Sequence, residues 1–341
     1  MGAYICTISE RDWNVAREQG VYGNRFEKRE DGKELNDSQK LSVIRDLISI
    51  KEGDLIFFHI RGRMTLHGVY RARSCAIWDN NVIWEDPYEV FPCRFLFEPH
   101  PDYEKLCLYD AHINVSSLYE LIDQGKIRSL VTLEFEQNIE ARAVKRIFVD
   151  DAKKIIRLLY RDFKKEKKVN FNPYMPSKSV PLKDKIFRVG GLENAIKAVI
   201  SWKLAYNDQE VKLLGLKGQY DFVNEFFVAP TTRKNIDFLC ESLRAYIILE
   251  IKKDECDERT LKQSLYYADL LGQRPWINKN YKKIVVLIGK SFNDKVKENA
   301  GLINKINSST EVKLIKYKPT NNGKWAKLME EKNYYDHKTL F

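Results

Sequence analysis

Two short stretches in the C-terminal half place charged side chains within or beside runs of apolar residues. Asp237 stands inside the run 236–239, and thirteen residues later Glu250 and Lys252 follow the apolar residues 247–249. Successive side chains of a strand point to opposite faces, so Glu250 and Lys252 point the same way. Neighbouring strands lie about 4.8 Å apart. We therefore expect two carboxylates and one ammonium group to converge at one edge of a sheet.

This set of groups suits metal-assisted hydrolysis of a phosphodiester. Mg²⁺ takes oxygen ligands, commonly one or two carboxylates together with water and substrate phosphate. Asp237 and Glu250 are therefore the predicted ligands of Mg²⁺ or Mn²⁺. Lys252 is predicted to orient the attacking water or to stabilise the charge that develops on phosphorus. The alternative for an isolated Glu-x-Lys is an ordinary surface ion pair at a strand end.

The order of these residues resembles the signature of PD-(D/E)XK nucleases, the restriction-endonuclease-like family. Asp237 and Glu250-Ile251-Lys252 match its core, although no proline directly precedes Asp237. Glu193 matches an acidic residue that such nucleases carry on the preceding helix. Gln263 and Tyr267, four residues apart and hence on one helix face, resemble the QxxxY motif of RecB-like members. The resemblance covers about 184–320 and implies that these residues belong to the catalytic site.

The surrounding sequence predicts the elements that would position this site. Apolar periodicity predicts helices over 192–205, 258–271 and 292–306, and strands over 221–228, 235–240, 246–251, 283–288 and 312–317. A helix, three strands, and then alternating helices and strands indicate a mixed sheet flanked by helices.

The N-terminal half predicts a small curved sheet with helices at its margins. Expected strands cover 3–8, 55–60, 66–71 and 90–97, and expected helices cover 10–19, the apolar positions from 41 to 48, and 150–163. Ser9 is placed to cap the first helix, and Gly20 follows its end. The whole chain is therefore expected to be α/β or α+β.

The strands and glycines of the first 150 residues resemble the PUA-like superfamily, and most closely its EVE and YTH branches of modified-base readers. That resemblance implies an aromatic pocket for a flipped base, for which Tyr22, Trp78 and Trp84 are the candidates. Asn24 is the candidate for a hydrogen bond to the base edge. Tyr22 stands where the YTH pattern has a tryptophan.

Four arginines beside these strands are candidates for contacts to the nucleic-acid backbone, although a solvated face is the equal alternative for each. They are Arg61, Arg63, Arg71 and Arg73.

A change of composition separates the two halves. Residues 164–168 are charged, and prolines at 173, 176 and 181 interrupt regular structure. We predict a PUA-like reader domain over 1–163, a solvated linker over 164–183 and a nuclease domain over 184–341.

Composition narrows the class of partner and compartment. The net charge of +10 and the pI of about 9.1 favour a polyanion such as nucleic acid. The six cysteines form no CxxC pair, which indicates reduced thiols in a cytoplasmic protein. No apolar run is long enough to span a membrane, and we find no secretory signal. The sequence has no Walker A motif, so no nucleotide cofactor is expected.

Taken together, a base reader joined to a nuclease predicts a modification-dependent, type IV-like restriction endonuclease acting on double-stranded, base-modified DNA. One active site per chain favours a homodimer for double-strand cleavage. A structure-specific repair nuclease, NucS-like and acting on mismatches or forks, is the alternative enzyme. A nucleic-acid-binding protein with an inactive nuclease fold is the third hypothesis.

Overall fold

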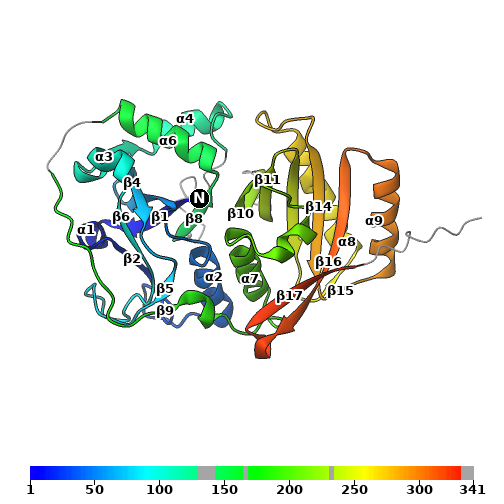
Figure 1. Ribbon diagram of the computed structural model, residues 1–341, viewed down its shortest axis with the longest axis horizontal. Helices are drawn as coiled ribbons and strands as arrows, with labels where there is room; N and C mark the ends of the chain where they lie inside the picture. The colour runs from blue at the N-terminus through cyan, green and yellow to red at the C-terminus, as the bar shows by residue number, and fades with distance from the viewer. Residues whose placement is uncertain (129–142, 164–167, 230–233, 332–341) are drawn as a thin grey trace, which may run out of the picture. The chain divides into compact units, whose positions relative to one another are not determined.

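The structure is a computed structural model that describes residues 1–128, 143–163, 168–229 and 234–331 (Figure 1). The chain is a mixed α/β protein and divides into two compact units, Met1–Lys185 and Ile186–Phe341. Unit 1 contains a curled half-barrel sheet, and unit 2 contains a separate mixed sheet.

The sheet of unit 1 has the strand order β8-β1-β3-β4-β6-β5-β9, with β2 paired to β6 and β7 paired to β4. Only β1 and β3 pair in parallel among its described strands. Its strands are β1 (Ala3–Ser9), β2 (Val21–Asn24), β3 (Leu55–Arg61), β4 (Thr65–Ala72), β5 (Ile77–Trp78), β6 (Cys93–Pro99), β7 (His112–Asn114), β8 (Val144–Ile147) and β9 (Val180–Pro181). Its helices are α1 (Glu10–Gln19), α2 (Asp37–Leu47), α3 (Glu104–Leu108), α4 (Ser116–Asp123) and α6 (Val149–Arg161), with 3-10 turns η1 (Pro101–Tyr103) and η2 (Leu182–Lys185).

Local sequence explains where the first two helices begin and end. The Ser9 side chain accepts a hydrogen bond from the backbone of Asp12, and Gly20 ends α1 in the left-handed region at φ 60°. A reciprocal capping box between Asn36 and Gln39 begins α2. The predicted cap and stop of α1 are therefore confirmed.

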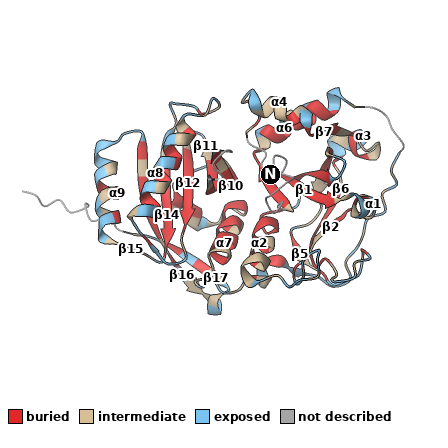
Figure 2. Cartoon of the chain, turned by 180° about the vertical axis from the view of Figure 1, so that it is seen from behind, coloured by how far each residue is buried: buried red, intermediate tan, exposed pale blue. Residues whose placement is uncertain are grey.

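Strand alternation gives the sheet of unit 1 two different apolar faces. Ile5 and Phe57 pack with residues of α3, α4 and α6 in one aliphatic core, and these helices lie together beside the sheet in Figure 1. Phe58, the next residue of β3, instead contacts Trp13 of α1 and the aromatic ring of Tyr22. Figure 2 shows these strands as largely buried.

The segment predicted as a solvated linker belongs largely to unit 1. Its residues 164–167 lie outside the described part of the chain, but from Lys168 onward the segment lies against the first sheet. The backbone N–H of Asn172 donates to Glu18 at 2.7 Å, that of Tyr174 donates to Gln19 at 2.7 Å, and β9 pairs with β5. The boundary between the units therefore falls at 185/186, and the described part of the predicted linker bonds to unit 1 while most of its residues stay exposed.

Unit 2 contains a six-stranded sheet in the order β10-β11-β12-β14-β16-β17. The strands β12, β14 and β16 are parallel, and the two edges are antiparallel. Helix α8 packs on β12 and β14, α9 packs on β16, and α7 packs on β12 and β17. The elements are α7 (Glu193–Ala205), η3 (Gln209–Leu214), β10 (Tyr220–Ala229), β11 (Lys234–Ser242), β12 (Ala245–Ile251), β13 (Glu255–Cys256), α8 (Glu258–Gly272), β14 (Lys282–Gly289), β15 (Ser291–Phe292), α9 (Asp294–Ile306), β16 (Thr310–Thr320), η5 (Asn321–Gly323) and β17 (Trp325–Glu330).

The predicted element order of unit 2 is confirmed from α7 to β16, and so is the prediction of a mixed sheet flanked by helices. Three strands of unit 2 were not predicted: the short β13 and β15, and β17, which extends the sheet beyond the predicted last strand. In unit 1 the curved sheet is confirmed, and the short strands β2, β5, β7, β8 and β9 were missed.

Candidate active site

The two predicted metal ligands lie on adjacent antiparallel strands. The register of β11 and β12 pairs Phe238 with Leu249, so one step further along it sets Asp237 opposite Glu250. Side chains opposite each other in an antiparallel pair share one face of the sheet. Both carboxylates are buried, with 5% and 3% of their residue surface exposed. The structure therefore brings together the acids that the sequence analysis selected.

The Asp237 carboxylate is held by contacts to both of its oxygens. Oδ2 accepts a hydrogen bond from the backbone N–H of Ile251 at 2.8 Å, which ties it to the end of β12. Oδ1 lies 2.6 Å from the ammonium Nζ of Lys197 on α7. The position of Asp237 is thus fixed by the backbone of one strand and by the charge of a helix residue.

Glu250 has one satisfied and one unsatisfied oxygen. Oε1 accepts from Nζ of Lys252 at 2.9 Å, whereas Oε2 is buried and has no hydrogen-bond partner. Burial and the nearby Asp237 carboxylate raise the pKa of Glu250 to about 7. A buried, unpartnered carboxylate oxygen costs free energy. Glu250 therefore has an oxygen that a cation would satisfy.

Lys252 lies beside the carboxylates on the same face, as strand alternation predicts. Burial alone would lower its pKa, but the Glu250 carboxylate outweighs burial and raises the pKa of Lys252 above its ordinary value. The amine therefore remains protonated at neutral pH. Its side chain is 31% exposed, so its remaining N–H donors can reach water.

The remaining predicted site residues lie on the helices α7 and α8. The amide nitrogen of Gln263 donates to the hydroxyl of Tyr267, so the two residues contact each other as predicted. Burial raises the pKa of Tyr267, and the Glu250 carboxylate adds to that rise. Glu193 contacts neither predicted metal ligand directly but lies 2.8 Å from Nζ of Lys197.

Lys197 is the site residue that the sequence analysis missed. It stands four residues after Glu193 on α7, and its side chain is 11% exposed. Its position on one helix face with Glu193 was visible in the sequence. Its contact with Asp237, across forty residues of chain, was not.

The carboxylate oxygens of this site are ligands of the kind that a hard divalent cation such as Mg²⁺ binds. Two carboxylates from adjacent strands face each other, and one of them has an unpartnered oxygen. Among the residues that the structure describes, no three acidic, histidine or cysteine side chains are grouped closely enough to hold a metal. The protein would therefore supply two ligands and leave the others to water and substrate oxygens, as is common for Mg²⁺.

The candidate base-binding residues of unit 1 lie on two faces of its sheet. Tyr22 is 1% exposed, its ring packs on Phe95, and its hydroxyl bonds to the backbone of Thr7 and to the side chain of Asn24. Strand alternation makes the next residue, Gly23, face the other side of β2. There a side-chain carbon on Gly23 would collide with Trp84. Tyr22 and Trp84 therefore lie on opposite sides of the strand, which contradicts a shared cage.

The two tryptophans also have other partners. Trp84 is buried and stacks on Phe91 with ring centres 5.3 Å apart. Trp78 on β5 packs edge-on against Phe26, and Nζ of Lys185 lies 4.4 Å from the centre of its ring. Trp78 is the more accessible of the two. Both Trp78 and Asn24 pair with Cys93 of β6, so Trp78 shares a face of the sheet with Asn24 and Tyr22.

The predicted backbone-binding arginines each have a partner within unit 1. Arg61 lies 2.5 Å from Glu30, and Arg63 lies 2.5 Å from Glu10. Arg71 contacts Glu98, and Arg73 donates to the carbonyl of Tyr174 at 2.6 Å. A phosphate would have to compete with these partners.

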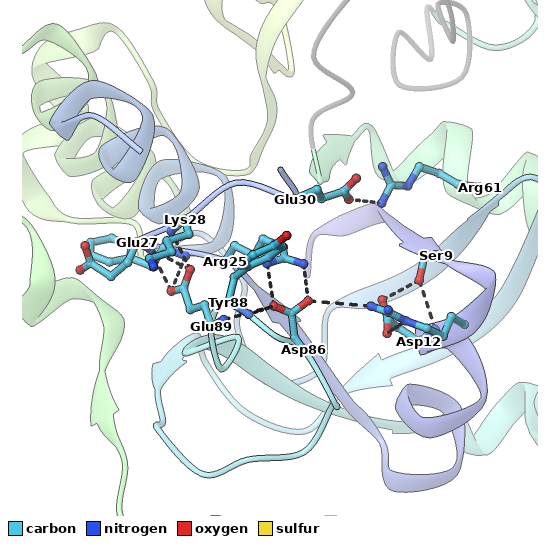
Figure 3. Close-up of polar contacts among 12 residues, drawn as sticks. Ser9, Asp12, Arg25, Glu27, Lys28, Glu30, Arg61, Asp86, Tyr88 and Glu89 are labelled. Carbon is cyan, nitrogen blue, oxygen red and sulfur yellow. Dashed lines mark hydrogen bonds and ion pairs between the residues drawn. The ribbon is translucent and has the colours of Figure 1, made fainter. Parts of the chain in front are cut away.

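Figure 3 shows the same arrangement next to β2. Arg25 lies on Asp86, and Glu89 accepts hydrogen bonds from the backbone N–H groups of Phe26, Glu27 and Lys28 at 2.8–2.9 Å. Three successive N–H groups of this kind are typical of an anion-binding nest. In this protein an internal carboxylate fills the nest.

Two buried polar side chains of unit 1 were not selected from the sequence. Thr7 and His59 are paired across β1 and β3, and parallel register places them on the same face. The hydroxyl of Thr7 and both ring nitrogens of His59 are buried without a hydrogen-bond partner. Burial lowers the pKa of His59 to about 4, so its ring is neutral at pH 7.

Comparisons with known proteins add no family to this description. No protein-family model matches the chain, and no curated protein matches it. All six cysteines are free, as predicted. Of the helices in the described segments, none has the length and apolarity needed to cross a membrane.

Proposed function

We propose that this protein is a metal-dependent DNA endonuclease of the PD-(D/E)XK type, with its active site in unit 2. One observation carries the proposal: the buried Asp237 carboxylate is bonded to the backbone of Ile251, the residue after Glu250, and the Glu250 carboxylate binds Lys252. The unpartnered Oε2 of Glu250 adds a position suited to a cation. The net charge of +10 is consistent with a nucleic-acid substrate.

In this proposal the acidic residues bind the metal and the basic residue donates hydrogen bonds. Asp237 and Glu250 hold Mg²⁺ or Mn²⁺, and the bound cation would polarise the scissile phosphate and acidify water. Lys252 stays protonated and donates hydrogen bonds to the attacking water or to the phosphate oxygens. The Ile251 backbone N–H keeps the Asp237 carboxylate in place while substrate binds. Gln263 and Tyr267 support the site from α8.

The finer part of the proposal is modification-dependent, type IV-like cleavage, with unit 1 reading a modified base in double-stranded DNA and two chains acting as a homodimer. The resemblance of 1–150 to PUA-like readers supports it. In unit 1, Trp78 is the predicted aromatic residue that retains accessible surface. Thr7 and His59 offer unpartnered polar atoms.

A second candidate is a structure-specific repair nuclease that ignores modification. It is favoured by the placement of Tyr22 and Trp84 on opposite sides of β2, because such an arrangement does not form a two-sided base cage.

Cleavage of matched duplexes tests both candidates. The substrates are unmodified, 5-methylcytosine-bearing, N6-methyladenine-bearing, mismatched and forked DNA, each with Mg²⁺ and with EDTA. Cutting of one modified duplex alone supports the modification-dependent enzyme. Cutting of mismatched or forked plain DNA supports the repair nuclease. Salt-sensitive binding of DNA without cleavage in Mg²⁺ or Mn²⁺ would contradict both and favour a binding protein with an inactive nuclease fold.

A further inference from the structure

Lys197 occupies the oxygen of Asp237 that a metal would use. Oδ2 of Asp237 accepts from the backbone N–H of Ile251, so Oδ1 is the oxygen that no backbone group contacts and the better placed of the two for a cation. Nζ of Lys197 lies 2.6 Å from that Oδ1. An ammonium group at this distance and a divalent cation on the same oxygen would repel each other strongly.

Lys197 contacts Glu193 at the same time as Asp237. Nζ of Lys197 lies 2.8 Å from Oε1 of Glu193, one helical turn earlier on α7. A flexible lysine side chain can therefore leave Asp237 and keep an ion pair with Glu193. Glu193 is 34% exposed and Asp237 is 7% exposed at the side chain, so this movement is toward solvent.

The charges of the cluster also favour replacement of the Lys197 ammonium group by a metal ion at Asp237. The cluster contains three carboxylates, Glu193, Asp237 and Glu250, and two ammonium groups, Lys197 and Lys252. Without a metal the two lysines neutralise most of this negative charge. When Lys197 withdraws from Asp237, both cation ligands face the site with only the Lys252 ammonium beside them.

We propose that Lys197 is an internal counter-ion that competes with the divalent metal for Asp237, so that metal loading breaks its contact with Asp237 and leaves its ammonium group paired with Glu193 alone. This inference rests on the proposed function. It gives Lys197 a regulatory role at the site: it stabilises the metal-free protein and sets the metal concentration at which the site fills. It also gives Glu193 the role of a positioning residue that holds the displaced lysine.

The role predicts two effects of opposite sign for Lys197→Met. Metal affinity should rise about tenfold or more, because one positive charge near the cation is removed. The thermal stability of the metal-free protein should fall, because two carboxylates lose their counter-ion. Lys197→Arg, which keeps the charge, should leave metal affinity within about threefold of wild type. A purely structural lysine would lower both stability and affinity when replaced.

The experiment measures Mn²⁺ binding by calorimetry and metal-free unfolding by scanning calorimetry on the full chain. Lys253→Met is the matched control, because Lys253 is a neighbouring lysine that is 52% exposed and pairs with Asp254. It should change metal affinity less than about threefold.

The outcomes separate this inference from the proposed function. Tighter Mn²⁺ binding by Lys197→Met, with binding lost in Asp237→Asn, supports the competition. Unchanged or weaker binding by Lys197→Met, with Asp237→Asn still abolishing binding, overturns the competition and leaves the nuclease proposal standing. Binding that is absent in all variants, or indifferent to Asp237→Asn, overturns the metal site itself and the competition with it.

Discussion

The two regions that the sequence marked for function differ in how they are built. In unit 2, the charged residues predicted from a short spacing lie on adjacent strands, where Glu250 contacts Lys252 and Asp237 bonds to the backbone of Ile251. In unit 1, Trp84 lies on the side of β2 opposite to Tyr22, and Tyr22 and Trp78, which share a face, pack on other aromatic rings. Charged groups are rarely buried without a partner, so their burial points to a site. Aromatic residues are buried for packing alone, so their presence does not.

The largest expected effect tests the packing role of Tyr22. Tyr22→Ala removes a buried ring that packs on Phe58 and Phe95, and we expect it to destabilise unit 1 by about 3–5 kcal/mol. Tyr88→Ala is the control, because Tyr88 is 45% exposed, and it should cost less than about 1 kcal/mol. Urea unfolding measures both.

Tyr22→Phe sharpens the same comparison. It keeps the ring and removes hydrogen bonds to Thr7 and Asn24, so a loss of about 1 kcal/mol is expected. Selectivity for a modified duplex should stay unchanged. A selectivity that disappears in a fully folded Tyr22→Phe protein would return Tyr22 to the base pocket.

Lys252→Met tests the charged region. Removing one donor to the developing charge should lower the cleavage rate by about 10²–10³-fold. Lys253→Met removes the adjacent, exposed lysine and should leave the rate within about twofold. Single-turnover cleavage with Mg²⁺ measures both rates. Equal losses in the two variants would show that the effect is one of general charge and not of position.

The two regions should also respond to pH in opposite directions. Burial raises the pKa of Glu250 to about 7 from the ordinary 4.5, so the folded state holds that proton more tightly. The resulting stabilisation is present below pH 4.5 and is lost as pH rises through 7. Burial lowers the pKa of His59 to about 4 from the ordinary 6.5, so stability is lost as pH falls from 6.5 toward 4. Each effect amounts to at most about 3.4 kcal/mol.

Glu250→Gln and His59→Leu each remove one of these two titrating groups and so separate their contributions to stability. In EDTA, Glu250→Gln should gain stability relative to wild type between pH 5 and 8. His59→Leu should gain relative to wild type between pH 7 and 4. Scanning calorimetry across this range gives the differences. A parallel shift of a variant and wild type at all pH values would contradict the burial assigned to that residue.

The smallest effect concerns the paired arginines of unit 1. Arg61→Ala should change stability by less than about 1 kcal/mol, because its pair with Glu30 is largely exposed. If Arg61 contacts a phosphate, Arg61→Ala lowers the salt dependence of DNA binding by about 0.9 in log–log slope. Glu30→Gln frees Arg61 and should strengthen binding. Fluorescence anisotropy in EDTA measures both, and identical slopes for all three proteins would exclude Arg61 from the DNA interface.

The sequence predicted much of unit 2 because its signals are local. The apolar runs around Asp237 and Glu250 define two strands, and strand alternation places Glu250 and Lys252 on one face. The contact of Lys197 with Asp237 was not predictable, because it depends on how α7 packs on the sheet.

In unit 1 the missed elements are short strands that tertiary pairing creates. The strands β5 and β9 have two residues each and exist because they pair with each other and with β6. The attachment of the predicted linker to unit 1 was missed for the same reason. Its prolines and lysines indicate an irregular chain, but not that Asn172 and Tyr174 bond to the end of α1.

Single-turnover cleavage of duplex DNA by wild type and Asp237→Asn, in Mg²⁺ or Mn²⁺ and again in EDTA, tests the central claim most directly. The account predicts cutting by wild type with metal, none in EDTA, and a loss of at least about 10²-fold in Asp237→Asn. Cutting that persists in EDTA, or that Asp237→Asn leaves unchanged, would contradict a metal-dependent site on β11 and β12.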